Sequence, residues 1–108
     1  MATSKDFIGY ISERFNGNEL TFRPMMGEYL VYYKGKLVGD ACDNRLLIKP
    51  VESVKAFLPD AEYQPPYDGA RPLILVENID DGEFLRELFE KMYPELPEPK
   101  TKKKVNKK

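Results

Sequence analysis

The sequence predicts a single α+β domain of two layers, in which three helices cover an antiparallel sheet of about five strands. Apolar residues alternate with polar ones between residues 19 and 50, and tight turns interrupt the alternation. Apolar residues at both ends of the chain recur at helical spacing. The 108 residues, of which 42% are hydrophobic, suffice for one core but not for two. We expect the order α-β-β-β-β-α-β-α.

The first helix is expected to begin after Thr3-Ser4, because a hydroxyl followed by Asp6 is typical of a helix cap. Its apolar stripe ends where Asn16-Gly17 favours a left-handed stop. Residues 19–23 then alternate as a strand that ends at Pro24, and a three-residue turn through Gly27 is expected to follow. The helix should therefore cover a sheet that starts at this strand.

Residues 25–50 predict three further strands joined by two-residue turns at Lys34-Gly35 and Asp43-Asn44. Pairing outward from both turns places alternate side chains on opposite faces of the sheet. The face expected to carry the core holds Leu30, Tyr32, Leu37, Gly39, Ala41, Leu46 and Ile48. The outer face is expected to hold Tyr29, Val31, Tyr33, Val38, Asp40, Cys42, Arg45, Leu47 and Lys49.

The second half of the chain predicts two helices around one strand. A short helix over residues 51–58 should end at Pro59, and residues 60–72 lack periodicity and should form a loop. Residues 73–76 predict a strand, and Asp80 with Glu83 should cap the last helix. The expected domain spans residues 1–97, and the lysine-rich residues 98–108 are expected to be disordered.

Composition argues against catalysis and against a bound cofactor. The chain has no histidine, which removes triads, histidine-based acid–base chemistry and most zinc sites. Its one cysteine, Cys42, has no partner for a disulfide and suits a reducing cytoplasm. No phosphate-binding glycine pattern or membrane-spanning run occurs. We therefore expect a cytoplasmic protein that is not an enzyme, without catalytic residues, metal ligands, cofactor or membrane contact.

The outer face of the sheet is the candidate binding site. Tyrosines and aliphatic residues rimmed by charges match the composition of interface cores, so a protein partner or a second copy of the chain is one interpretation. A second interpretation is that the chain's own residues 60–72 cover this face. A third is that its aromatic and basic residues stack single-stranded bases. The predicted protein-binding residues are Arg23, Tyr29, Val31, Tyr33, Val38, Arg45, Leu47 and Lys49.

The charges divide unevenly along the chain. The last nine residues contain six lysines, which leaves 11 basic against 18 acidic residues in residues 1–99 and a net charge of −7 there. An acidic body binds nucleic acid poorly by itself, but a basic tail could tether it. The residues of this alternative, nucleic-acid-binding site are Lys100, Lys102, Lys103, Lys104, Lys107 and Lys108.

Several motifs together resemble the amino-terminal domain of the TfoX (Sxy) family. The central segment at residues 23–36, the pair Val38-Gly39, the run Cys42-Asp43-Asn44-Arg45-Leu46, and Lys49-Pro50 carry the resemblance. Pro66-Tyr67 with Gly69-Ala70-Arg71-Pro72 matches a later segment of the family. The resemblance covers about residues 3–97.

This resemblance implies a fold similar to secretion chaperones and a non-enzymatic regulator linked to bacterial competence. The best-known family members act at promoters together with the cyclic-AMP receptor protein, so a transcription regulator is the implied partner. Larger members carry a second, helical domain, where this chain has only residues 94–108. The chain therefore resembles the stand-alone, single-domain branch of the family.

Overall fold

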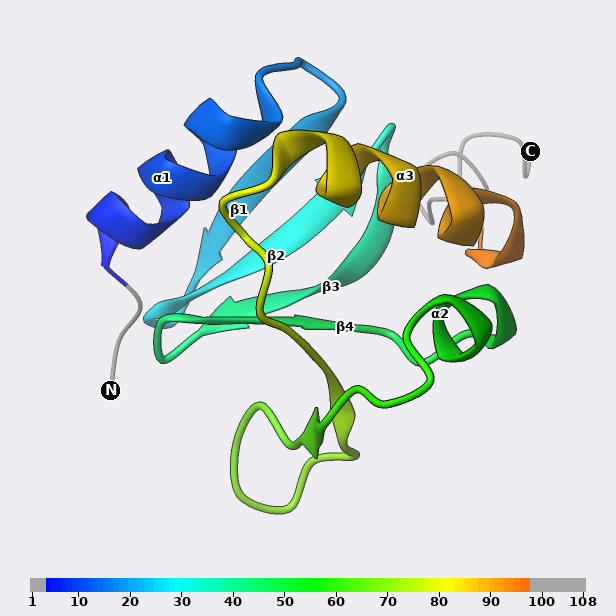
Figure 1. The fold of residues 1–108 in the computed structure, drawn as a ribbon. Helices are drawn as coiled ribbons and strands as arrows, with labels where there is room; N and C mark the ends of the chain where they lie inside the picture. The colour runs from blue at the N-terminus through cyan, green and yellow to red at the C-terminus, as the bar shows by residue number, and fades with distance from the viewer. Residues whose placement is uncertain (1–3, 98–108) are drawn as a thin grey trace, which may run out of the picture.

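The computed structural model describes residues 4–97, which form one α+β unit of three α-helices and a six-stranded antiparallel sheet. Helices α1 and α3 lie across one face of the strands, and α2 lies beside α3 (Figure 1). The elements are α1 (Lys5–Phe15), β1 (Leu20–Met25), β2 (Glu28–Tyr33), β3 (Lys36–Cys42), β4 (Arg45–Ile48), α2 (Glu52–Phe57), β5 (Tyr63–Gln64), β6 (Leu73–Val76), α3 (Gly82–Met92) and the 3-10 turn η1 (Tyr93–Glu95). The predicted fold class is confirmed.

The strands lie in the order β1-β2-β3-β4-β6-β5, so the first four form a meander and β6 joins its far side. Strand β5 was not expected, because two residues are too few to show alternation in a sequence. It pairs Tyr63 with Ile74 and Gln64 with Leu73 at the edge of the sheet. The segment that the sequence predicts to be a loop therefore supplies the last strand.

Side chains cap both long helices. The Ser4 hydroxyl accepts a hydrogen bond from the Phe7 N–H at 3.1 Å, and Asn16 ends α1 with a φ of 56°. Helix α3 is capped by Asp81, whose Oδ1 accepts from the Phe84 N–H at 3.1 Å, and not by Asp80. Adjacent aspartates carry the same capping chemistry, so the sequence located the helix start to within one residue.

The turn between β1 and β2 is shorter than expected, and this shifts the register of the sheet by one residue. Met26 and Gly27, with φ values of 51° and 86°, form a two-residue turn between Met25 and Glu28. Leu20 therefore pairs with Tyr33, where a three-residue turn would have paired it with Tyr32. A shift of one residue exchanges the two faces of a strand.

A second irregularity lies between β2 and β3. Tyr32 pairs with Leu37 as expected, but the next pair is Val31 with Gly39, so Val38 is an extra residue on β3. Beyond this bulge, Gly39 pairs with Ile48 as the sequence predicts. The expected faces are therefore correct from Gly39 through β4 and reversed on β2 and at the start of β3.

The core consequently forms between the helices and the opposite face of β2. Val31, Tyr33 and Val38 are fully buried there and pack in one cluster with Ile11, Leu88 and Phe89 of the helices. Ala41, Leu46 and Ile48 are buried in the same cluster, as predicted. Leu30, Tyr32 and Leu37, expected inside, are only half-buried and lie on the face away from the helices.

None of the helices in residues 4–97 is long and apolar enough to cross a bilayer.

Candidate functional site

The outer surface predicted from the sequence does not exist as a continuous exposed face. Val31, Tyr33, Val38 and Leu47 have no solvent-exposed area. Tyr29 is half-buried against the core. The two register differences described above turn Tyr29, Val31 and Tyr33 of β2 toward the helices. Leu47 is also buried but does not belong to that core cluster. A docking surface built on Tyr29, Val31 and Tyr33 is therefore excluded.

The charged residues predicted to rim that surface are dispersed. Arg23 is exposed on β1, which is an edge strand, and Lys49 is half-buried after β4. Burial lowers the pKa of Lys49, while the nearby negative charge of Asp40 acts in the opposite direction. Burial, followed by the charge of Glu28, raises the pKa of Asp40. Asp40 and Lys49 therefore interact with each other, while Arg23 lies two strands away from Asp40.

Arg45 holds the loop that follows β5. Its Nη1 donates to Oε1 of Gln64 at 2.6 Å, and its Nη2 donates to the carbonyl oxygen of Pro66 at 3.4 Å. The thiol of Cys42 donates to the same carbonyl at 3.4 Å. The interpretation that the chain's own loop covers the outer face is thus correct at Cys42 and Arg45. The conformation of this segment is fixed by a buried thiol and a guanidinium.

An ionic cluster connects β2 to α3. The Tyr33 hydroxyl donates to Oε2 of Glu90, and Lys34 Nζ donates to the same oxygen at 2.7 Å. Burial, and then the bond to Glu90, raises the pKa of Tyr33. The bonds from Lys34 and Tyr33 lower the pKa of Glu90. All these groups pair with one another, so the cluster is structural and offers no unpaired group for chemistry.

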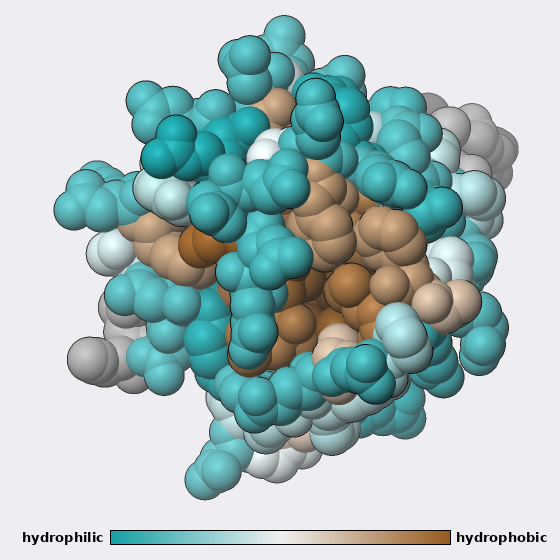
Figure 2. Space-filling model, viewed as in Figure 1, coloured by the Kyte–Doolittle hydropathy of each residue, from teal (hydrophilic) through white to brown (hydrophobic). Residues whose placement is uncertain are grey.

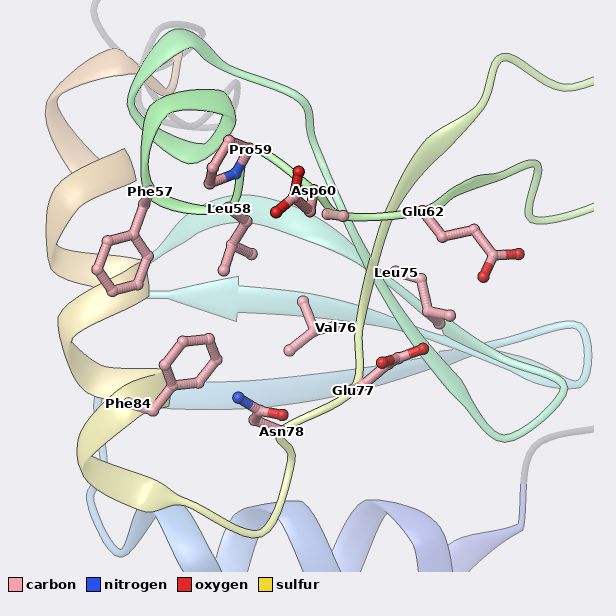
Figure 3. Close-up of a pocket in the computed structure, with 11 residues that line it drawn as sticks. Phe57, Leu58, Pro59, Asp60, Glu62, Leu75, Val76, Glu77, Asn78 and Phe84 are labelled. Atoms are coloured by element: carbon pink, nitrogen blue, oxygen red, sulfur yellow. The ribbon is translucent and has the colours of Figure 1, made fainter.

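A hollow with apolar walls lies between α2, α3 and the segment that follows β6. Figure 2 shows it as a brown depression surrounded by hydrophilic side chains. The hollow has a volume of about 380 Å³. Phe57 and Phe84 form one wall, with ring centroids 5.6 Å apart and planes at 21°. Buried Val76 and half-buried Leu58 lie next to these rings (Figure 3).

The local sequence determines where the residues that wall the hollow lie. Pro59 cannot continue α2, so the chain turns immediately after Phe57 and Leu58 and leaves both side chains at the end of the helix. The Asp81 cap starts α3 close by and sets Phe84 in its first turn. The rings are brought together from residues 27 positions apart in the sequence. No short-range pattern could have indicated the hollow, because it depends on the packing of two helices.

Three exposed carboxylates stand on the other side of the hollow. They belong to Asp60, Glu62 and Glu77, and Figure 3 shows them beyond the aromatic wall. Within residues 4–97 no lysine or arginine forms an ion pair with any of the three. Gln64 Nε2 donates to Oε2 of Glu62 at 2.8 Å, which leaves the charge unneutralised. The hollow therefore combines apolar walls with a negative rim.

Nothing in the described part of the chain gathers three histidine, cysteine, aspartate or glutamate side chains into a metal-binding group. The predicted nucleic-acid-binding lysines, from Lys100 to Lys108, lie outside the described residues. The sequence reasoning missed the hollow entirely. Phe57 before Pro59 and Phe84 after the aspartate pair are each also typical of the apolar side of a single helix, so neither residue indicates a hollow by itself.

Comparison with known proteins finds a relative of similar length. No family model matches the chain, and no solved structure matches it. The chain is similar to the "Uncharacterized 12.7 kDa protein in trpE 5'region" of Spirochaeta aurantia, with 31% identity over 106 residues that cover 95% of this chain and 91% of the relative. The resemblance to TfoX stays a prediction from its motifs. The shared length and identity show that this chain belongs to the same family as the 12.7 kDa Spirochaeta aurantia protein.

Proposed function

We propose that this protein is a non-enzymatic adaptor or regulatory domain that acts by binding another protein at the hollow between α2, α3 and β6. The observation that carries the proposal is the stacked pair of Phe57 and Phe84, which remains partly exposed beside Leu58. Aromatic side chains in a surface hollow are the groups that contribute most to binding energy in protein interfaces. On this proposal the hollow binds a partner and carries out no reaction.

The side chains that usually catalyse reactions give little support to an enzymatic alternative. The chain contains no histidine. Cys42, its single cysteine, is buried, and burial raises the pKa of its thiol. A thiol with a raised pKa is a poor nucleophile at neutral pH, because the thiolate is the reactive form. No residue of the hollow pairs a nucleophile with a base.

A variant that fills the hollow tests this function without removing a core side chain. Half-buried Ala61 lines the hollow, so Ala61→Phe would occupy it. The matched control is Ala70→Phe, which makes the same change in the loop after β5. Peptides selected from a random library against the full chain should lose binding to Ala61→Phe and retain it with Ala70→Phe. Urea unfolding confirms that both variants fold. Selected peptides that bind all three proteins equally would contradict the proposal.

The motif resemblance to TfoX supports a more specific role in transcriptional regulation. On this proposal the partner is a transcription regulator, and the cyclic-AMP receptor protein is the first candidate to test in a binding titration. The titration should show association with the wild type that Ala61→Phe abolishes. Binding that survives Ala61→Phe would place the contact elsewhere, and absence of binding would leave the regulatory role without its first candidate partner.

The uneven charge distribution supports an alternative in which the tail lysines bind nucleic acid. Phosphate contacts release counterions, so such binding weakens steeply as salt increases. A gel shift at about 50–100 mM salt should then be lost when Lys102, Lys103 and Lys104 are replaced by glutamine. Absence of a shift at the lower salt concentration would remove this alternative.

A further inference from the structure

We propose that the partner segment bound by the hollow is a basic peptide that inserts one apolar side chain between two or more lysines or arginines. This inference rests on the proposed function and specifies the chemistry of its partner. The apolar side chain would contact Phe57 and Phe84, and the cations would lie against Asp60, Glu62 and Glu77.

The size and the walls of the hollow suit one apolar side chain. A volume of about 380 Å³ accommodates one large side chain of a peptide. Phe57 and Phe84 stack on each other and leave part of their surface to solvent, so an inserted aromatic or long aliphatic side chain would bury apolar area on both. A single anchored side chain is a common centre of binding energy in peptide recognition.

The three carboxylates lie on one side of the hollow, opposite the aromatic rings. Asp60 and Glu77 are exposed and form no ion pair within residues 4–97, and Glu62 contacts only the neutral amide of Gln64. On the aromatic side, the Nζ of Lys91 lies 5.2 Å from the Phe57 ring centroid. Lys91 is already paired with Glu87 at 3.8 Å. Uncompensated carboxylates beside apolar walls attract cations.

The backbone at the rim also suits an extended peptide. Strand β5 pairs only with Leu73 and Ile74 of β6, and the last bond between the two segments runs from the Leu75 N–H to the Glu62 carbonyl oxygen at 2.9 Å. On the side of β5, residues 76–78 therefore pass the hollow beyond the last pairing with that strand, while Val76 still pairs with Leu46 of β4 on the other side. A peptide lying along this edge could hydrogen-bond to the backbone while its side chain enters the hollow.

Short synthetic peptides test the inference on the full chain. The probe is acetyl-Lys-Lys-Phe-Lys-Lys-amide, and its controls replace either Phe by Ser or all four Lys by Glu. Titrations followed by ¹H–¹⁵N spectra should show shifts for Phe57, Ala61, Glu62 and Phe84 with the probe. Both controls should bind at least about tenfold more weakly, because each lacks one half of the recognition.

Charge reversal identifies the carboxylates. The double variant Glu62→Lys with Glu77→Lys should weaken probe binding by about tenfold or more at low salt, and the wild-type affinity should fall as salt rises. The control Glu13→Lys with Glu52→Lys changes the net charge equally on the exposed surfaces of α1 and α2. It should alter the affinity by less than about twofold, because these residues do not line the hollow.

Each other outcome overturns this inference in a distinguishable way. If library peptides that depend on Ala61 prove to be acidic or uncharged, the binding function stands and the basic partner is wrong. If the probe binds only after Lys102, Lys103 and Lys104 are replaced by glutamine, the occupant is the chain's own tail. If no peptide depends on Ala61, both the function and this inference fail.

Discussion

The hydroxyl of Tyr33 on β2 donates a hydrogen bond to Oε2 of Glu90 on α3. The side chain itself is fully buried, with its ring against Phe15, Phe89 and Tyr93 at centroid distances of 5.6–6.1 Å. A residue that the sequence suggested for an exposed binding face is therefore a principal contact between the sheet and the last helix. Its polar end reaches a partner at the edge of the core, which is how buried tyrosines are usually satisfied.

Substitutions at Tyr33 should show, through the free energy of unfolding, whether this side chain is a buried core contact or part of an exposed binding face. Tyr33→Phe keeps the ring and loses one hydrogen bond, so the free energy of unfolding should fall by about 0.5–1.5 kcal/mol. Tyr33→Asp removes the ring and buries a carboxylate beside Glu90, which should cost about 4 kcal/mol or more. Urea unfolding followed by circular dichroism measures both. A fully stable Tyr33→Asp protein would mean that this face of β2 is exposed after all.

Gly39 should tolerate no side chain. A Cβ at this position would lie 2.0 Å from the Leu47 carbonyl oxygen and 2.7 Å from the Ile48 Cα, both in the backbone of β4. Gly39→Ala should therefore destabilise the protein by about 3 kcal/mol, because one of two paired strands has to move. The matched control is Gly9→Ala in α1, where nothing lies within 4 Å. It should stabilise the helix by about 0.5–1 kcal/mol. Equal changes in stability for Gly39→Ala and Gly9→Ala in urea unfolding would contradict the close approach of Gly39 to β4.

Glu90 should make stability depend on acid pH. The bonds from Lys34 and Tyr33 lower its pKa below the ordinary value of 4.5, so the folded state releases this proton more readily than the unfolded state. Its contribution to stability is complete above pH 4.5 and is lost as the pH falls through the lowered pKa. The midpoint of urea unfolding should thus fall less steeply with acidification in Glu90→Gln than in the wild type. Parallel pH profiles would show that the carboxylate contributes nothing.

Cys42 should resist alkylation in the native protein. It is 2% exposed, and burial raises the pKa of its thiol, so both access and reactivity are reduced. Iodoacetamide at neutral pH should modify the protein slowly, and urea should make the reaction rapid. Because the chain contains one cysteine, mass spectrometry reports this site alone. Rapid native modification would show that the loop at Pro66 opens readily away from the thiol.

Two features of the sequence favour the observed register of β2. A glycine inside a strand often marks a bulge, and Gly39 is paired at the position where the register shifts. Met26-Gly27 also fits a two-residue turn, which would have paired Phe22 with Val31. Either feature exchanges the buried and the outward face of β2 relative to the predicted register. The positions of the turns were predicted correctly, but the length of the turn at Met26-Gly27 was not. The pairs across Asp43-Asn44 needed no correction, because that turn has one plausible length.

The sequence by itself determined the fold class, both long helices and the four strands of the meander, because periodicity and capping act over a few residues. Only the tertiary structure decided which face of β2 is buried and where the hollow lies. Face selection depends on a parity that a single bulge reverses, and the hollow joins Phe57 to Phe84 through the packing of two helices. Such long-range packing leaves no repeating pattern along the chain, so it is decided only when the elements come together.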